Sequence, residues 1–397
     1  MLISALGGRR IPRACFQPAQ LAKASLRGFQ LMRDIALESS PTLQSTSSSI
    51  YIKINQNLIL KRNEGKREMK KFFVVGLSLL FTVMVMLVPV QAVGTNPGNL
   101  YAVKPGDTLE KIADKFETSV HDLKITNGLQ TNLLFVGQKL RVPVLYKVEA
   151  GDTLQTISTA FNSTVQTIKK ANGLSSDALY IGQVLKVPPK RMMMQGQHIL
   201  MTKEEFEDWI FNHKFNRKVK LIQQHHTWAP SYKHFTGSNH FRLLKGMENF
   251  HVKQMGWKTI AQNITTFPDG KIAVSRPFHI APEGTIGWRA NTAGIMIENI
   301  GNFDKGFDVM TKEQKETIVY ITALLCVKFG LTPSIDTITY HHWWDLNSGE
   351  RVLDNSKGHP VKTCPGTAFF GGNTTNSAIN NFYPLVTNKM REILRNK

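Results

Sequence analysis

Cysteine is scarce in this chain, with only Cys15, Cys326 and Cys364 among 397 residues. Three cysteines cannot form a disulfide framework, which excludes the small disulfide-stapled folds. The chain also lacks a P-loop, zinc-finger cysteine pairs and an RNA-recognition signature, so we expect no nucleic-acid partner. No paired-acid motif of the kind that flanks a glycosidase cleft stands out either.

Positive charge, in contrast, is abundant. Lysine and arginine number 49 against 29 acidic residues, a formal net charge of +20. The first 92 residues hold 13 basic and 4 acidic residues, which leaves 36 against 25, or +11, for the remainder. This excess favours a polyanionic partner. Since the nucleic-acid motifs are missing, anionic lipid and anionic wall polymers remain as candidates.

One long hydrophobic run lies far from the N-terminus. Two lysines precede the apolar residues 72–90, and the segment closes with "VQA" at residues 90–92. This pattern predicts a secretory signal over residues 69–92 that is cleaved after Ala92. The alternative is an uncleaved anchor, but Pro89 and the small residues after it favour cleavage, so we expect no stable membrane anchor. Residues 1–68 are basic and serine-rich without periodicity, and we interpret them as a non-native extension preceding a true start at Met69.

An internal repeat with a period of 45 residues follows the signal. "GDTL" at residues 106–109 returns at 151–154, and "NGL" at 127–129 returns at 172–174. Each unit, residues 100–143 and 145–188, predicts the order strand, helix, helix, strand. Asp or Thr of the first motif can cap one helix, and Asn-Gly of the second can end the other.

Both units resemble the lysin-motif (LysM) module over nearly its whole length. The resemblance implies binding to glycans that contain N-acetylglucosamine, chiefly peptidoglycan, between the loop after the first strand and the loop before the last. The alternative is that these residues only form caps and turns. The residues implied are Gly106, Asp107, Thr108, Asn127, Gly128, Leu129, Gly151, Asp152, Thr153, Asn172, Gly173 and Leu174.

The pattern changes after a predicted linker at residues 189–198. In the domain at residues 199–397, Thr202 and Glu205 form a capping box before a helix, and Thr311 caps a long helix that runs to Gly330. "TTFPDGKI" predicts two strands joined by a turn. Strands and helices interleave, which predicts an α/β domain with a mixed sheet.

Two histidine pairs and a cysteine stand out in this domain. "QQHHTW" and "TYHHWW" each place two histidines at the predicted end of a strand, and "KTCPG" places Cys364 on a turn. Imidazole nitrogen and thiolate are ligands that zinc prefers, and catalytic zinc sites use three protein ligands. Cys326, in contrast, lies in an apolar helical run and is expected in the core.

Residues 199–385 resemble zinc amidases of the N-acetylmuramoyl-L-alanine type, whose fold peptidoglycan recognition proteins share. "IQQHHTW", "GIMIENIGNFD", "ITYHH" and "KTCPG" carry the match in the expected order. The resemblance implies a Zn²⁺ ion held by His225, His341 and Cys364. Strand alternation then predicts that His226 and His342 point elsewhere.

The same resemblance implies a mechanism. Zinc lowers the pKa of a bound water, which attacks the amide between N-acetylmuramic acid and L-alanine. Lys362 matches the lysine that stabilises the oxyanion, and Glu298 is the candidate general base because a carboxylate in an apolar strand is costly without a purpose. A salt bridge for Glu298 and an ordinary solvated role for Lys362 are the alternatives.

Two features depart from many relatives. Gln262 stands where they have a tyrosine, and the stretch between His341 and Cys364 is longer, so it is a candidate wall of the substrate groove. Of Trp343 and Trp344, we expect at least one in the core.

The sequence therefore predicts a secreted, wall-associated peptidoglycan amidase, an autolysin, from a bacterium of the Gram-positive type. The alternatives are a receptor-like protein that binds peptidoglycan without cleaving it, and a different wall hydrolase. Autolysis, cell separation, spore-related lysis and prophage lysis all fit the pattern.

Overall fold

The computed structural model describes residues 99–284, 286–353 and 357–396. The predicted signal segment, the start at Met69 and Cys15 lie outside the described residues. These described residues belong to one compact unit. Within the described ranges, no helix is long and apolar enough to cross a membrane.

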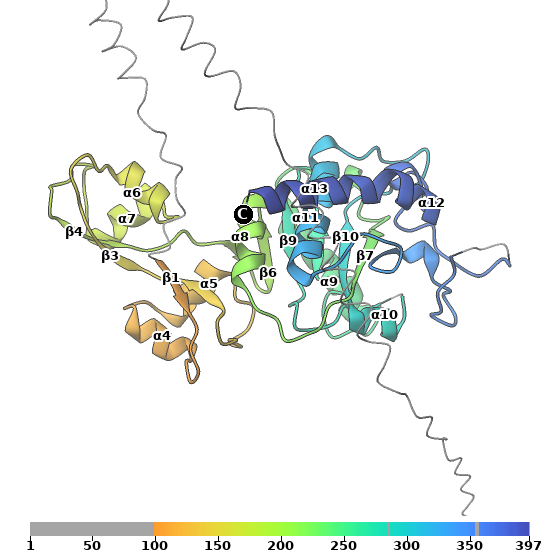
Figure 1. Ribbon diagram of the computed structural model, residues 1–397, viewed down its shortest axis with the longest axis horizontal. Helices are drawn as coiled ribbons and strands as arrows, with labels where there is room; N and C mark the ends of the chain where they lie inside the picture. The colour runs from red at the N-terminus through yellow and green to blue at the C-terminus, as the bar shows by residue number, and fades with distance from the viewer. Residues whose placement is uncertain (1–98, 285, 354–356, 397) are drawn as a thin grey trace, which may run out of the picture. The chain divides into compact units, whose positions relative to one another are not determined.

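The two repeats fold as predicted, each as a two-stranded antiparallel sheet with two helices (Figure 1). Each repeat has its own hydrophobic core. Repeat 1 consists of β1 (Leu100–Ala102), α4 (Leu109–Lys115), α5 (Val120–Asn127) and β2 (Lys139–Arg141). Repeat 2 consists of β3 (Val144–Lys147), α6 (Leu154–Ala160), α7 (Val165–Asn172) and β4 (Val184–Val187).

Matching caps explain why both repeats adopt the same fold. The Thr108 and Thr153 side chains accept a backbone N–H bond at the start of α4 and α6. Gly128 and Gly173 end α5 and α7 with φ of 58° and 64°, a left-handed conformation that glycine adopts without strain.

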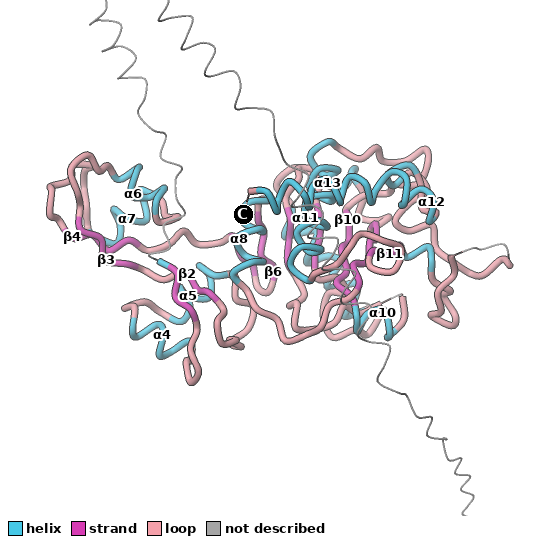
Figure 2. The backbone as a smooth tube through the Cα atoms, in the orientation of Figure 1, coloured by secondary structure: helices cyan, strands magenta, loops and turns pink. Residues whose placement is uncertain are grey.

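The C-terminal domain is built on a seven-stranded mixed sheet in the order β11-β7-β10-β8-β9-β6-β5. Figure 2 labels β6, β10 and β11 of this sheet. The first four strands of this order run parallel to one another, and the remaining pairings are antiparallel. The mixed α/β architecture is therefore confirmed. The strands are β5 (Met193–Gln195), β6 (His198–Met201), β7 (Leu221–His226), β8 (Ile264–Thr266), β9 (Ile272–Val274), β10 (Gly294–Asn299) and β11 (Ile338–Tyr340).

The linker prediction for residues 189–198 was wrong in its second half. Residues 193–195 form β5, the edge strand, which pairs with β6 through a tight turn at Gly196, where φ is 59°. A three-residue edge strand is too short to produce a periodic pattern, so the turn glycine was the sole sequence signal.

Helices cover both faces of this sheet. Helices α8, α11 and α13 share the main core with Ile222, Ile295 and Ile297 of the sheet. Helix α9 packs on the opposite face against Leu200 and Ala273. The helices are α8 (Lys203–Asn212), α9 (His240–Lys253), α10 (Trp288–Ala293), α11 (Lys312–Phe329), α12 (Thr375–Ser377) and α13 (Tyr383–Arg395). The Thr202–Glu205 capping box and the Thr311 and Gly330 caps are confirmed.

Strand alternation decides which side chains face α9. In β7, Ile222 and Gln224 face α11, where Gln224 donates to Thr322. His225 consequently lies on the other face. In β10, Ile295 and Ile297 enter the main core, which leaves Glu298 on the same side as His225, and the two are paired in register.

Candidate metal centre

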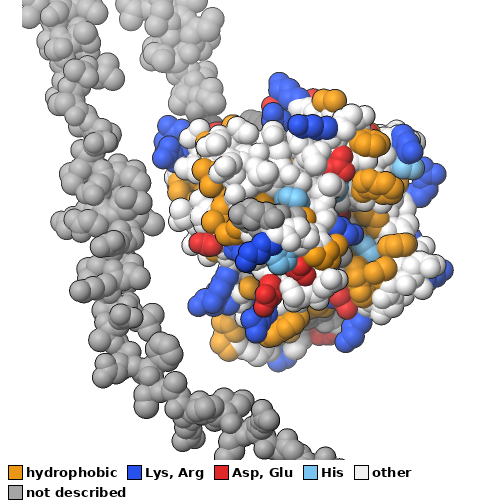
Figure 3. Space-filling model, turned by 90° about the vertical axis from the view of Figure 1, so that its right-hand side faces the viewer, with side chains coloured by type: hydrophobic (Ala, Val, Ile, Leu, Met, Phe, Trp, Pro, Cys, Tyr) orange, Lys and Arg blue, Asp and Glu red, His pale blue; other side chains and the backbone are white. Residues whose placement is uncertain are grey.

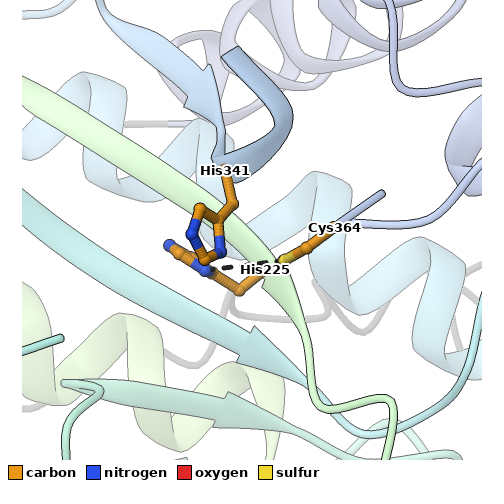
Figure 4. A group of neighbouring side chains, drawn as sticks. All are labelled: His225, His341 and Cys364. Carbon is orange, nitrogen blue, oxygen red and sulfur yellow. Dashed lines mark hydrogen bonds between the residues drawn. The ribbon is translucent and has the colours of Figure 1, made fainter. Parts of the chain in front are cut away.

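Three of the predicted residues converge at the carboxyl edge of the parallel strands. His225 is the penultimate residue of β7, His341 follows β11 directly, and Cys364 lies on a loop (Figure 4). Their ligand atoms all lie within 4.8 Å of one another, and Cys364 Sγ lies 3.6 Å from His225 Nδ1. Tetrahedral zinc with ordinary bond lengths separates a nitrogen and a sulfur ligand by about 3.6 Å. The donor set and its spacing therefore fit a metal ion.

Burial shifts the pKa values of His225 and Cys364. Burial, and then the neighbouring His341, lowers the pKa of His225 well below its usual value, so its imidazole is neutral, the form that binds metals. Burial raises the pKa of the Cys364 thiol well above its usual value. A thiol in this environment keeps its proton unless a cation replaces it.

The loop that carries Cys364 is fixed by its neighbours. Asp304, from "GNFD", accepts bonds from the Thr363 hydroxyl at 3.0 Å and the Thr367 backbone at 2.9 Å. Gly366 has φ of 118°, and a Cβ there would lie 2.5 Å from the Phe303 backbone. The Cys-Pro-Gly turn thus needs its glycine, and this turn fixes the backbone that carries Cys364.

The second histidine of each pair has another partner. The ring of His226 accepts the Phe303 backbone N–H at 3.1 Å. His342 lies in a 3₁₀ turn over residues 341–343, not in a strand as expected, and its Nδ1 lies 2.6 Å from the Lys362 carbonyl oxygen. His342 therefore helps to position the loop between Lys362 and Cys364.

A cavity of about 860 Å³ opens over the cluster, and both predicted catalytic side chains line it. Burial raises the pKa of the Glu298 carboxyl to about 8, while the nearby Lys362 ammonium lowers it. The structure thus brings Glu298 and Lys362 together with the three candidate ligands.

One wall of this cavity is apolar, and the sequence did not predict it. Helix α9 and the segment after it contribute Phe250, Met255 and Trp257, and the β7 end contributes Trp228. Trp228 is 63% exposed with φ of 56°, an uncommon backbone conformation for a bulky residue. The face drawn in Figure 3 shows hydrophobic side chains close to histidines. Such a wall, beside convergent polar groups, is typical of a ligand site.

The two sequence features that depart from many relatives lie largely outside the cavity. Gln262 is fully buried, and its amide donates to Thr265, outside the cavity lining. Of the long stretch between His341 and Cys364, only Lys362 and Thr363 line the cavity among the described residues. Trp343 is in the core, as expected for one of the two tryptophans, and Cys326 is buried there too.

The candidate glycan residues have structural partners in both repeats. Asp107 and Asp152 accept bonds from Tyr101 and Tyr146, each at 2.8 Å. Asn127 and Asn172 bind the strand that follows, and the threonines cap helices. Gly106 and Gly151 turn the first loop with φ of 82° and 88° and lie exposed. Leu129 belongs to the core of repeat 1, and Leu174 packs against that of repeat 2.

Comparison with known families agrees with this architecture. Residues 101–143 and 146–188 match the model of the LysM domain, and residues 215–367 match that of the N-acetylmuramoyl-L-alanine amidase family. The chain carries two LysM domains and an amidase domain. The cluster, Glu298 and Lys362 all lie within the matched amidase region.

Curated relatives match over short stretches. N-acetylmuramoyl-L-alanine amidase sle1 of Staphylococcus epidermidis is 46% identical over 52 residues, 13% of this chain and 16% of the relative. An autolysin of Enterococcus faecalis is 53% identical over 49 residues, 12% of this chain and 6% of the relative. The matches thus span less than a fifth of these relatives. Among solved structures, the endolysin amidase LysCS from Clostridium intestinale has a TM-score of 0.28 at 22% identity, covering 39% of this chain and 79% of its own.

Proposed function

We propose that this protein is a peptidoglycan amidase that hydrolyses the bond between N-acetylmuramic acid and L-alanine of the stem peptide, held on the wall by its LysM domains. The observation that carries the proposal is the His225–His341–Cys364 cluster in one cavity with Glu298 and Lys362. The match of residues 215–367 to the N-acetylmuramoyl-L-alanine amidase family supports the same reaction. The short matches to a staphylococcal amidase and an enterococcal autolysin support a secreted, wall-associated protein of a Gram-positive bacterium.

Zinc is the metal that suits this site. A set of two imidazoles and one thiolate favours zinc over the oxygen-seeking cations magnesium and calcium. When bound, zinc would supply the Lewis acidity that makes water a nucleophile near neutral pH.

Glu298 acts first as the general base and then as the general acid in this proposal. Its carboxyl lines the cavity beside His225, and a pKa near 8 lets it take a proton and return it near neutral pH. The proton leaves the attacking water and is delivered to the departing amine of L-alanine, which balances the hydrolysis.

Lys362 supplies the positive charge for the oxyanion. The ammonium group lines the cavity, and its backbone is held through His342. A fixed donor aimed at developing charge is worth most where water is partly excluded. The apolar wall of Trp228 and α9 provides that exclusion on one side of the cavity.

Digestion of purified peptidoglycan tests the proposal through the identity of the products. We expect mass analysis to find free stem peptides that begin with L-alanine, with the glycan strands uncut. Release of reducing sugars would assign a glycosidase, and fragments that begin inside the stem would assign a peptidase. Wall binding without any release would make this a receptor-like protein.

A further inference from the structure

The two LysM domains share one fold, yet their second loops have different surroundings. In repeat 1, Asn127, Gly128 and Leu129 are all buried. In repeat 2, the matching Gly173 is exposed, and its two neighbours are half-buried. These loops are the ones that the LysM resemblance assigns to glycan binding.

Residues of the amidase domain and the segment before it cover the loop of repeat 1. The indole Nε1 of Trp209 in α8 donates to the Gly128 carbonyl at 3.4 Å. A Cβ on Gly128 would lie 2.8 Å from Met192 Sδ and 3.0 Å from Trp209 Nε1, whereas a Cβ on Gly173 would meet nothing within 4 Å. The cavity left beside Gly128 measures only about 40 Å³, space for at most a few water molecules.

Polar contacts hold the same surface in place. The Gln130 side chain donates to the backbone carbonyls of Gln197 at 2.7 Å and Ser275 at 3.0 Å. Arg141 binds Asp208 of α8 with two bonds, at 2.6 and 3.1 Å. Two parallel bonds from a guanidinium fork fix both partners in one orientation.

Repeat 2 lacks these contact residues. Forty-five positions later, serine replaces Gln130 and lysine replaces Arg141, as Ser175 and Lys186. A serine is too short to reach as Gln130 does, and a lysine cannot form the bidentate bond. The side chains of repeat 1 are thus specialised for this contact.

An aromatic position shows the same contrast. Phe135 lines the small cavity against the amidase domain together with Gly128 and Leu129. Its counterpart in repeat 2 is Tyr180, which is 75% exposed, and the next residue, Ile181, is 76% exposed. Since the repeats share one fold, Tyr180 lies beside the Asn172–Leu174 loop. An exposed aromatic face beside a polar loop suits stacking against a sugar ring.

We propose that repeat 1 is docked on the amidase domain as a structural part of it, and that repeat 2 alone binds wall glycan through the 172–174 loop and Tyr180. This inference rests on the proposed function in one respect, namely that the LysM domains bind glycan. Its chemical partner is a strand of N-acetylglucosamine-containing sugar.

The same substitution at the two equivalent glycines tests the inference. Asparagine tolerates the left-handed conformation that both positions need. Gly128→Asn forces a side chain against Met192 and Trp209, while Gly173→Asn enters open space on the glycan loop. The measurements are thermal unfolding and calorimetric binding of an N-acetylglucosamine hexamer to the protein.

The expected results are opposite for the two variants. The unchanged protein binds one hexamer per chain. Gly173→Asn and Tyr180→Ala weaken binding at least tenfold and leave the unfolding temperature unchanged. Gly128→Asn lowers the unfolding temperature and does not weaken binding of the hexamer.

Three results would overturn the inference: two hexamers per chain, weaker binding in Gly128→Asn, or equal unfolding temperatures for the two asparagine variants. If the unchanged protein binds no hexamer, glycan recognition by the LysM domains fails, and the stability contrast still decides the docking of repeat 1. Peptidoglycan digestion reports separately on the amidase.

Discussion

Replacing Glu298 by glutamine should make the metal-free protein more stable and the enzyme far slower. Glutamine keeps the shape of the side chain but cannot ionise. The Glu298 carboxyl has a pKa of about 8 in the folded protein, raised from 4.5 by burial. An unfolded chain at pH 7 carries this group ionised, whereas the metal-free folded chain holds its proton. The folded state therefore loses stability as the pH rises from about 4.5 toward 8. A bound zinc ion would lower this pKa and leave the carboxylate able to accept a proton.

The size of the effect follows from the same shift. The usual carboxyl pKa of 4.5 lies 2.5 units below pH 7. At about 1.4 kcal/mol per unit, burying this carboxyl lowers the free energy of unfolding at pH 7 by at most about 3 kcal/mol. Glu298 is half-buried, so water reduces this cost, and we expect about 1 to 3 kcal/mol of stabilisation in Glu298→Gln. The loss of a general base should lower kcat about 10²- to 10⁴-fold.

Denaturant titration of chelator-treated protein at pH 5 and pH 7 measures the first effect, and peptide release from peptidoglycan measures the second. The two proteins should be nearly equal in stability at pH 5 and differ at pH 7. Zinc content should be unchanged in the variant, since Glu298 is not one of the clustered ligands. A variant that is less stable at pH 7, or that keeps full activity, would refute the reasoning.

Four further predictions concern the site and the fold. Cys364→Ser should lose bound zinc and activity but still bind peptidoglycan, and metal analysis beside a sedimentation assay checks this. Lys362→Met should lower kcat about 10²-fold at unchanged zinc content, with Lys362→Arg retaining part of the activity; equal loss in both would contradict a charge role. Trp228→Ala should raise KM for peptidoglycan, whereas the control Trp288→Ala, 73% exposed and outside the cavity, should not. Burial lowers the pKa of His213 to about 4, so acidification from about pH 6.5 toward 4 should cost the chelator-treated protein about 1.4 kcal/mol per pH unit through His213 alone. The free energy of unfolding of His213→Phe should therefore depend less on pH, and an equal dependence in both proteins would contradict this.

Local signals made much of the fold predictable from the sequence. The 45-residue shift set the two repeats, and the Thr311 and Gly330 caps set the limits of α11, because caps act over one turn of chain. The two histidine pairs and Cys364 stood out by residue type, and the family resemblance selected His225 and His341 from those pairs. The structure brings the two histidines together because the parallel strands β7 and β11 end at one edge of the sheet. Strand β5 was not predicted because three residues are too few to show the alternating hydrophobic pattern of a strand.

Contacts between distant segments were not predictable in the same way. The apolar wall of the cavity comes from α9, whose Phe250 looks in sequence like any residue of an amphipathic helix. The burial of Gly128 depends on Trp209, 81 residues away. The sequence carried one sign of this contact, namely that repeat 2 has other residues in place of Gln130 and Arg141. That difference can be interpreted only when the partners of Gln130 and Arg141 are known.

Zinc titration into metal-free protein tests the central claim most directly, with the release of L-alanine-terminated peptides from purified peptidoglycan as the readout. We expect no release without metal, a rise that stops at one zinc ion per chain, and no rise in Cys364→Ser. Full peptide release by the metal-free protein, or equal restoration in Cys364→Ser, would contradict it.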